Sequence, residues 1–221
     1  MSDTLTSSRR RLKEARPQQL LDAALDLFVE KGFAATRAEE VAQRAGVAKG
    51  TLYLYYPSKE ELLKAVIREH LSSRIAAGAA EADKHRGPVA ELLREVFSRW
   101  WLEVFDSPTS GVFKLIITEV RNFPEIAEFY VAEVIQPAEN LIARIVQRGI
   151  DSGEFEALDV PNVVHSLCLP MVMLCVHKHG LAACSQHKID GHRFIAEHVA
   201  LVVRGLQARL ESRSLLNPGS P

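Results

Sequence analysis

Cysteine is scarce in this sequence: the 221 residues include three, at positions 168, 175 and 184, and no Cys-x-x-Cys pair. So few cysteines cannot build a disulfide framework, and we expect free thiols in a reducing compartment. Strand signals are also nearly absent, because no sustained alternation of apolar and polar residues and no Asn-Gly or Asp-Gly hairpin turn occurs. These absences favour an all-α protein.

Long hydrophobic runs are missing as well. The longest, from Leu167 to Val176, has ten residues and contains Pro170, whereas a bilayer span needs about 20. The stretch from Met1 to Arg16 is polar and basic and lacks the apolar core of a secretory signal. We therefore expect a cytoplasmic protein with no membrane partner.

What the sequence does have is a normal share of core-forming residues, 47% hydrophobic against 25% charged. The net charge of −1 hides a gradient. Residues 1–59 carry ten Lys and Arg against seven Asp and Glu, and residues 60–221 carry 17 against 21. The basic N-terminal part is therefore the candidate for contact with a polyanion.

Apolar residues recur with helical spacing along most of the chain. Gly32 is expected to end the first helix in the left-handed conformation, and Ser58 to Glu61 fits a capping box that starts a helix after Pro57. The expected helices cover residues 17–31, 37–45, a short stretch from 49, 58–80, 89–105, 112–121, 124–135, 138–151, 160–179 and 191–210.

The helices at 37–45 and from 49 flank a short turn at Gly46, which is the spacing of a helix-turn-helix. In such a motif the second helix enters the major groove of DNA. Lys49 can neutralise a phosphate or bind guanine, Thr51 can bond to backbone or base, and a tyrosine hydroxyl can reach a phosphate. Thr36 with Glu39 fits a capping box for the first helix.

The run from Thr36 to Leu63, TRAEEVAQRAGVAKGTLYLYYPSKEELL, preceded by Phe28, Gly32 and Phe33, resembles the DNA-binding domain of TetR-type transcriptional regulators. The resemblance implies a homodimeric repressor that binds double-stranded DNA at a palindromic operator and is released by a small-molecule effector. It implies DNA contacts by Thr36, Arg37, Lys49, Gly50, Thr51, Tyr53, Tyr55 and Lys59. Ala48 departs from the Ser or Thr that often caps the recognition helix, a loss of about 1 kcal/mol.

The larger C-terminal part is rich in aromatic residues. Trp100 and Trp101 are adjacent on a predicted helix, so they point about 100° apart and cannot both face one narrow seam. They can pack in a core or line a wide cavity for an apolar or amphipathic compound. The residues 116–130 also resemble C-terminal domains of family members that control efflux pumps. The candidate ligand-binding residues are Phe97, Trp100, Trp101, Phe105, Phe113, Phe123 and Tyr130.

The expected organisation is a basic arm (1–15), a three-helix DNA-binding domain (16–60), a helical effector-binding and dimerisation domain (61–213) and a flexible tail (214–221). Arg9, Arg10 and Arg11 are either a DNA-contacting arm or a solvated tail. The helix at 160–179 is apolar on nearly every face, so the last two helices are the expected dimer interface.

Other functions stay open at this point. The histidines and cysteines crowded into residues 168–192 could form a metal or thiol sensor, although no Cys-x-x-Cys or His-x-x-x-His pair occurs there and we predict no metal site and no cofactor. A small helical enzyme or metal-binding module with a DNA-binding head is a further alternative, as is a nucleoid-type binder without ligand. The sequence lacks a Gly-rich phosphate loop, His-Glu-x-x-His and Gly-x-Ser-x-Gly, so we expect no catalysis.

Overall fold

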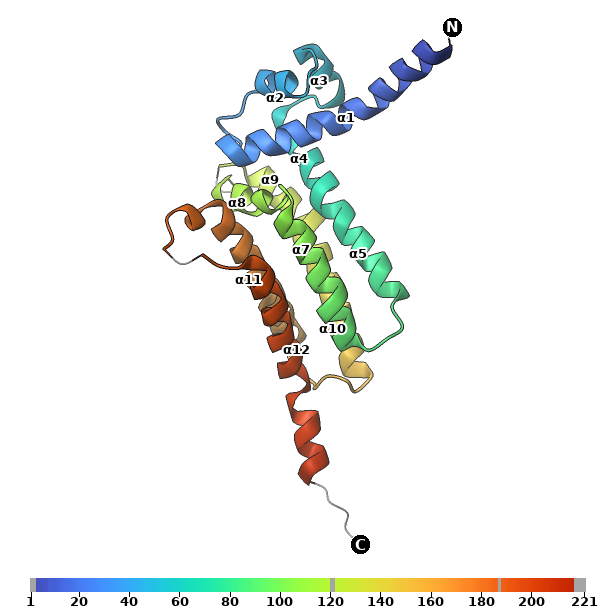
Figure 1. The fold of residues 1–221 in the computed structure, drawn as a ribbon, viewed down its shortest axis with the longest axis vertical. Helices are drawn as coiled ribbons and strands as arrows, with labels where there is room; N and C mark the ends of the chain where they lie inside the picture. Colours follow the sequence, from blue (N-terminus) through green and yellow to red (C-terminus); the bar gives the residue numbers. More distant parts are fainter. Residues whose placement is uncertain (1–2, 120–121, 187, 217–221) are drawn as a thin grey trace.

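The computed structural model describes residues 3–119, 122–186 and 188–216, and the side chains in these ranges from Arg16 to Gln207. A small group of helices, α1 to α4, lies at one end of an elongated molecule, and the remaining helices form a bundle along its long axis (Figure 1). The part of the chain that the structure describes has no strand. The all-α prediction is confirmed.

The four helices of the N-terminal domain and the helices of the C-terminal domain follow each other with short connections. Their bounds are α1 Asp3–Lys31, α2 Ala38–Arg44, α3 Lys49–Tyr55, α4 Lys59–Ile67, α5 Ser73–Lys84, α6 Val89–Leu92, α7 Ser98–Asp106, α8 Ser110–Glu119, α9 Pro124–Tyr130, α10 Gln136–Asp151, α11 Val160–His179 and α12 Gly191–Leu216. Leu181–Ala183 forms a 3₁₀ turn.

Three π-helical segments join consecutive helices into longer rods: Arg68–Ser72, Leu93–Phe97 and Val131–Ile135. The third was not expected, since Pro137 predicted a break between two helices. Proline lacks an N–H and crowds the carbonyl four residues before it. The wider π turn that precedes Pro137 accommodates this crowding, and the helix continues to Asp151.

The first helix also differs from the prediction, because it begins at Asp3 rather than at Pro17. Of the predicted arm, the backbone from Asp3 onward is helical, whereas the side chains of Arg9 to Arg11 lie outside the described ones. The predicted tail is partly helix, since α12 extends to Leu216. The remaining residues, 217–221, lie outside the described part.

Local turn chemistry follows the sequence closely. Gly32 and Gly46 have positive φ angles of 85° and 67°, as a left-handed helix end and a tight turn require. The Ser58 hydroxyl accepts a hydrogen bond from the Glu61 backbone N–H at 3.1 Å. The first capping box is shifted by one residue, because the Glu40 carboxylate accepts from the Arg37 N–H at 3.1 Å.

The Thr36 side chain belongs to the core of the N-terminal domain. It is 1% exposed, and its hydroxyl lies 2.7 Å from the Gly32 carbonyl and 3.1 Å from the Leu27 carbonyl. A hydroxyl has a single proton to donate, and these carbonyls compete for it. The structure therefore contradicts a phosphate contact by the Thr36 hydroxyl, which instead ties the start of α2 to the end of α1.

Lys59 fixes the same loop from the other side. Its ammonium donates to the carbonyls of Phe33 at 2.8 Å, Ala34 at 3.2 Å and Thr36 at 3.1 Å, and it lies 4.5 Å from the centre of the Phe33 ring. An ammonium has three donors, and all three are used. The phosphate contact predicted for Lys59 would therefore require at least one of these bonds to break.

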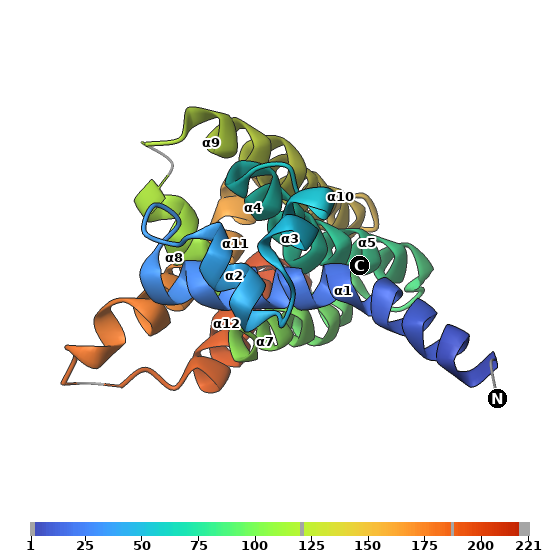
Figure 2. The same cartoon turned by 90° about the horizontal axis from the view of Figure 1, so that it is seen from above.

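The bundle carries α8 and α9 directly below the N-terminal helices, and α1 and α4 rest on them (Figures 1 and 2). Three glycines of the described residues, Gly111, Gly149 and Gly191, allow a close approach by another side chain. A Cβ on Gly111 of α8 would lie 2.5 Å from the Val29 side chain of α1, and one on Gly191 would lie 2.3 Å from the Phe105 ring. The bundle thus holds the DNA-binding helices through direct packing.

Helix α11 alone is long and apolar enough to cross a membrane, by length and composition, among the described residues. Core helices of soluble proteins pass the same test. One face of α11 is indeed buried, through Val163, Val164, Leu167, Met171, Leu174 and Cys175. Much of the rest of the helix is uncovered within one chain.

Replacing Lys59 with methionine tests its structural role. Charge-assisted hydrogen bonds are the stronger kind, so we expect Lys59→Met to lower the free energy of unfolding by about 2 kcal/mol, measured by urea denaturation. Lys31→Met is the matched control: it removes an exposed ion pair with Glu40 and should change stability little. Unchanged stability with weakened DNA binding would instead identify Lys59 as a phosphate contact.

Candidate nucleic-acid interface and effector cavity

Helices α2 and α3 cross at the end of the molecule farthest from the bundle (Figure 1). The turn between them is closed by hydrogen bonds from Gly46 N to the Gln43 carbonyl and from Val47 N to the Ala42 carbonyl. Leu52, with no exposed surface, anchors α3 to the core. Ala48 at its N-cap provides no side-chain cap, as the sequence predicts.

The outer face of α3 carries four of the eight predicted DNA contacts. Lys49 and Gly50 are exposed, Tyr53 is 42% exposed and Thr51 is half-buried. Arg37 is exposed at the start of α2. Tyr55 is half-buried, packs against the core and lies 6.4 Å from Tyr56 between ring centres, so it faces inward more than predicted. Leu54 on the same helix was not predicted to contact DNA, and its side chain is 85% exposed.

Several exposed basic residues of this domain are paired with acidic ones. Lys49 forms an ion pair with Glu39, Lys31 lies 2.7 Å from Glu40, and Arg44 lies 2.8 Å from Glu30. The hydrogen bond from Lys49 lowers the pKa of Glu39, and the same bond raises the pKa of Lys49. Exposed pairs of this kind contribute little to stability, so a phosphate can compete for these cations.

Two apolar chambers lie in the bundle, and both are partly open to solvent; the exposed Ile117 and Leu169, for example, line the larger one. The smaller, of about 190 Å³, lies between α5, the rod α6–α7 and α10, and its lining includes Ile75, Gly78, Leu92, Phe97, Leu141 and Ile145. The larger, of about 590 Å³, lies among α7, α8, the rod α9–α10 and α11, and its lining includes Leu71, Phe113, Ile116, Tyr130, Val134 and Val172. Both are lined by Ile75, Trp100, Trp101, Ala138 and Cys168, so they are neighbours.

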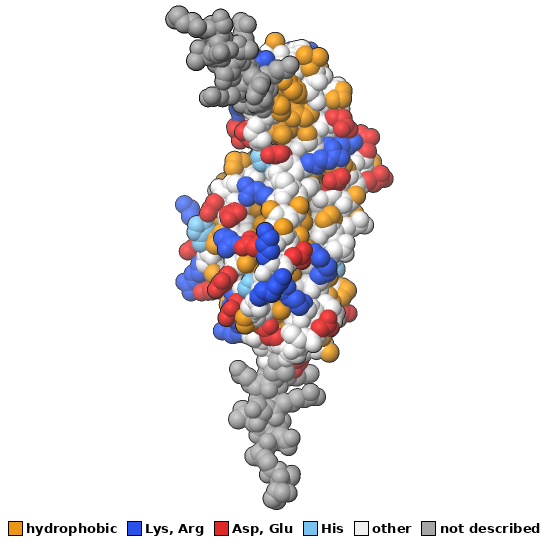
Figure 3. Space-filling model, turned by 90° about the vertical axis from the view of Figure 1, so that its right-hand side faces the viewer, with side chains coloured by type: hydrophobic (Ala, Val, Ile, Leu, Met, Phe, Trp, Pro, Cys, Tyr) orange, Lys and Arg blue, Asp and Glu red, His pale blue; other side chains and the backbone are white. Residues whose placement is uncertain are grey.

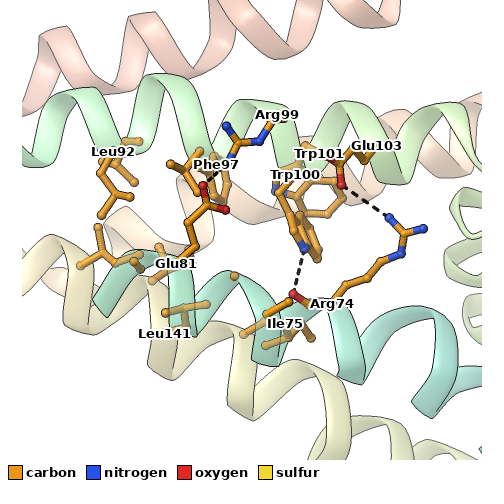
Figure 4. A pocket seen from close by; sticks show the side chains of 18 of the residues that line it. Arg74, Ile75, Glu81, Leu92, Phe97, Arg99, Trp100, Trp101, Glu103 and Leu141 are labelled. Carbon is orange, nitrogen blue, oxygen red and sulfur yellow. Dashed lines mark hydrogen bonds and ion pairs between the residues drawn. The ribbon is translucent and has the colours of Figure 1, made fainter. Parts of the chain in front are cut away.

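Charged side chains line the edges of both chambers. At the smaller one, Arg99 pairs with Glu81 and Arg74 lies 3.8 Å from Glu103 (Figure 4). At the larger one, His165 lies 3.5 Å from Glu139. Charges of both signs are also mixed over the face of the molecule shown in Figure 3. Apolar walls with a few charged groups at the edge suit an amphipathic molecule.

The two tryptophans at the junction differ in one respect. The indole N–H of Trp100 donates to the Arg74 carbonyl at 3.3 Å (Figure 4). The indole nitrogen of Trp101 is buried and has no hydrogen-bond partner. Of the described residues with such an unpartnered buried atom, only Trp101 lines the chambers. An unsatisfied buried donor costs about 1–3 kcal/mol.

The chambers are lined by five of the seven predicted ligand-binding residues: Phe97, Trp100, Trp101, Phe113 and Tyr130. The other two, Phe105 and Phe123, line neither chamber. Phe105 packs against Gly191, and the Lys178 ammonium lies 4.5 Å from the centre of the Phe105 ring. Phe123 packs against Phe33 of the N-terminal domain, with ring centres 4.8 Å apart.

The cysteines and histidines of residues 168–192 make separate contacts and do not form one cluster. Burial raises the thiol pKa of Cys168 and Cys175 to about 12, and protonated thiols are weak nucleophiles. His179 Nε2 lies 2.8 Å from Ser110 Oγ, and His192 Nε2 lies 2.7 Å from Asp106. His187 lies outside the described residues. Within the described part, no group of three or more His, Cys, Asp or Glu side chains is arranged to hold a metal ion.

Comparison with known proteins identifies both domains. Residues 20–66 match the family described as bacterial regulatory proteins, tetR family, and residues 83–183 match the tetracyclin repressor-like C-terminal domain. The fatty acid metabolism regulator protein of Bacillus subtilis (strain 168) is 31% identical over 155 residues, which cover 67% of this chain and 77% of that protein.

Solved structures agree with this assignment. The fatty acid degradation regulator FadR from Bacillus halodurans superposes with a TM-score of 0.72 at 22% identity, covering 87% of this chain and 96% of that one. FadR from Bacillus subtilis, solved in complex with stearoyl-CoA, gives a TM-score of 0.68 at 25% identity, covering 85% and 98%.

These relatives are transcriptional regulators and not enzymes. The helix-turn-helix at one end and the helical domain that follows it thus have the same origin as theirs. The chain belongs to the TetR family and is a DNA-binding transcriptional regulator.

Proposed function

We propose that the protein is a cytoplasmic homodimeric repressor that binds a palindromic operator and is released from it by an amphipathic acyl compound. The observation that carries this proposal is the placement of the two apolar chambers, because the helices that line them also support the DNA-binding domain. A ligand in the bundle can therefore influence the heads through packed side chains.

Dimerisation through the last two helices is supported by their uncovered faces. On α11 a second apolar stripe runs through Leu169, Val172, Met173 and Val176, with Leu169 61% and Met173 57% exposed. On α12 a stripe runs through Phe194, Leu201, Val202 and the exposed Gly205. Such spacing places each set on one side of its helix. A second copy of the chain would cover both stripes.

The heads would dock with α3 in the major groove. The exposed face of α3 offers Lys49, Thr51 and Tyr53 to the DNA, and no side chain fills the space around Gly50. Because a seven-residue helix makes few contacts, two heads on adjacent half-sites are needed for specificity. The cations now paired with Glu39, Glu40 and Glu30 would exchange these partners for phosphates.

The effector is proposed from the chambers and from the relatives. The similar FadR of Bacillus subtilis binds stearoyl-CoA, as its structure states. In this chain the larger chamber suits an acyl chain, and Arg74 and Arg99 at the edge of the smaller one suit an anionic head group. The buried Trp101 N–H between them would donate to the acyl carbonyl once the surrounding aromatic rings have moved aside.

Coupling between effector and DNA would run through α8 and α9. The Glu119 carboxylate at the end of α8 accepts a hydrogen bond from the Phe33 N–H at 3.2 Å, while Phe123 contacts the Phe33 ring. On the other side, Arg68 lies 4.6 Å from the Phe129 ring centre and 3.5 Å from Glu133. A shift of α8 or α9 on ligand binding would thus move the heads.

Selection of bound fragments from random duplex DNA, combined with analytical ultracentrifugation, tests the assembly. We expect a palindromic site and a dimer. The double variant Met173→Asp, Leu201→Asp changes one exposed residue on each of the two helices and none that lines a chamber. It should be monomeric and lose operator binding, since it buries charges in the proposed interface. Leu54→Asp, at the opposite end of the molecule, should remain dimeric. A monomeric wild type, or a site without two-fold symmetry, would refute the proposed assembly.

The effector is tested with palmitoyl-CoA and its thioether analogue S-hexadecyl-CoA, which lacks only the carbonyl oxygen. We expect the thioester to bind the wild type about tenfold more tightly, from one added hydrogen bond to a buried donor, and to release operator DNA. Trp101→Phe should bind both compounds equally, whereas Trp100→Phe, whose N–H already has a partner, should keep the preference. Failure of both compounds to bind would refute the proposed effector class.

A further inference from the structure

Leu54 is the most exposed large hydrophobic residue among the described side chains. Its side chain is 85% exposed, against 64% for the next, Leu181. An isolated surface leucine needs no explanation in general. This one, however, lies on the helix whose outer face the protein uses to meet DNA, one residue from Tyr53. Its neighbours on that face are otherwise polar or lack a side chain.

The surface of α3 divides into two adjacent strips. Residues four apart in a helix lie on the same face, about 40° from each other, and consecutive residues lie about 100° apart. Lys49 and Tyr53 form a polar strip, with the ammonium 5.8 Å from the ring centre. Gly50 and Leu54 form an apolar strip beside it. Apart from its chain neighbours and the backbone of its own helix, nothing lies within 4 Å of the position that a Cβ on Gly50 would take, so this strip can approach a surface closely.

The major groove offers a single apolar group to such a strip, the C5-methyl group of thymine. The other base edges present donors and acceptors, and a leucine that covered them would leave them without hydrogen bonds. We propose that Leu54 reads a thymine methyl group in each half-site of the operator. This assignment rests on the proposed docking of α3 in the major groove. It gives the protein a preference for thymine at one position of each half-site, which none of the polar residues of α3 needs to supply.

Uracil substitution isolates the interaction, because uracil differs from thymine in this setting by the methyl group alone. Starting from the selected operator, each symmetry-related pair of thymines is replaced by uracil, and binding is measured by fluorescence anisotropy. One pair should weaken wild-type binding by about 15-fold, or about fourfold per half-site, as expected for one methyl group removed from an apolar contact. Leu54→Ala should bind the thymine and uracil operators with nearly equal affinity.

Lys49→Ala is the matched control. It removes a charge from the adjacent strip, so it should weaken binding to both operators and leave their ratio unchanged. Because the Leu54 side chain is exposed, Leu54→Ala should retain the melting temperature of the wild type, which a thermal denaturation checks.

Two outcomes overturn the assignment, and they differ from a failure of the proposed function. If Leu54→Ala discriminates thymine from uracil as strongly as the wild type, or if no thymine pair is sensitive, Leu54 does not read a methyl group although the operator stands. If selection recovers no preferred sequence, the proposed docking fails first and the assignment fails with it.

Discussion

The position of the DNA-binding helices on the bundle depends above all on Phe33, in the loop at residues 32–36 that follows α1. Phe33 is fully buried there, between Phe28 at 5.4 Å and Phe123 at 4.8 Å between ring centres. Its carbonyl accepts from Lys59 and its N–H donates to Glu119. One residue thus joins α1, α4, α8 and α9, and the position of the heads relative to the bundle depends on it.

This arrangement explains how a small protein can combine two binding functions. The DNA-binding face keeps its cations in exposed pairs that exchange easily, whereas the bundle keeps its polar groups at the edges of two apolar chambers. Helix α8 contributes Phe113 and Ile116 to the larger chamber. Less than two turns further along the same helix, Glu119 contacts Phe33 of the N-terminal domain. A ligand that moves α8 therefore acts on Phe33 directly, and no long chain of contacts is needed.

The sequence was sufficient for most local features, although the first capping box begins at Arg37 and not at Thr36. Gly32, Gly46 and Ser58 act on their own neighbours in the chain, and their roles were predicted correctly. Lys59 and Thr36 were predicted to contact phosphate, but in the structure they bond to carbonyls around Gly32 and Phe33. The sequence could not show these partners, because the packing of α1 against α4 brings them together. Helical spacing placed Phe97 and Phe105 on an inward face, but it could not tell that Phe97 meets a cavity and Phe105 meets Gly191.

Coupling between ligand and DNA is proposed to depend on the hydrogen bond from the Phe33 N–H to the Glu119 carboxylate. It is tested by operator affinity with and without palmitoyl-CoA, in the wild type and in Glu119→Ala. We expect the ligand to weaken operator binding by about 10- to 100-fold in the wild type. In Glu119→Ala, ligand and operator should each still bind, but the ligand should change operator affinity by less than about threefold. An undiminished effect of the ligand in this variant would contradict the account.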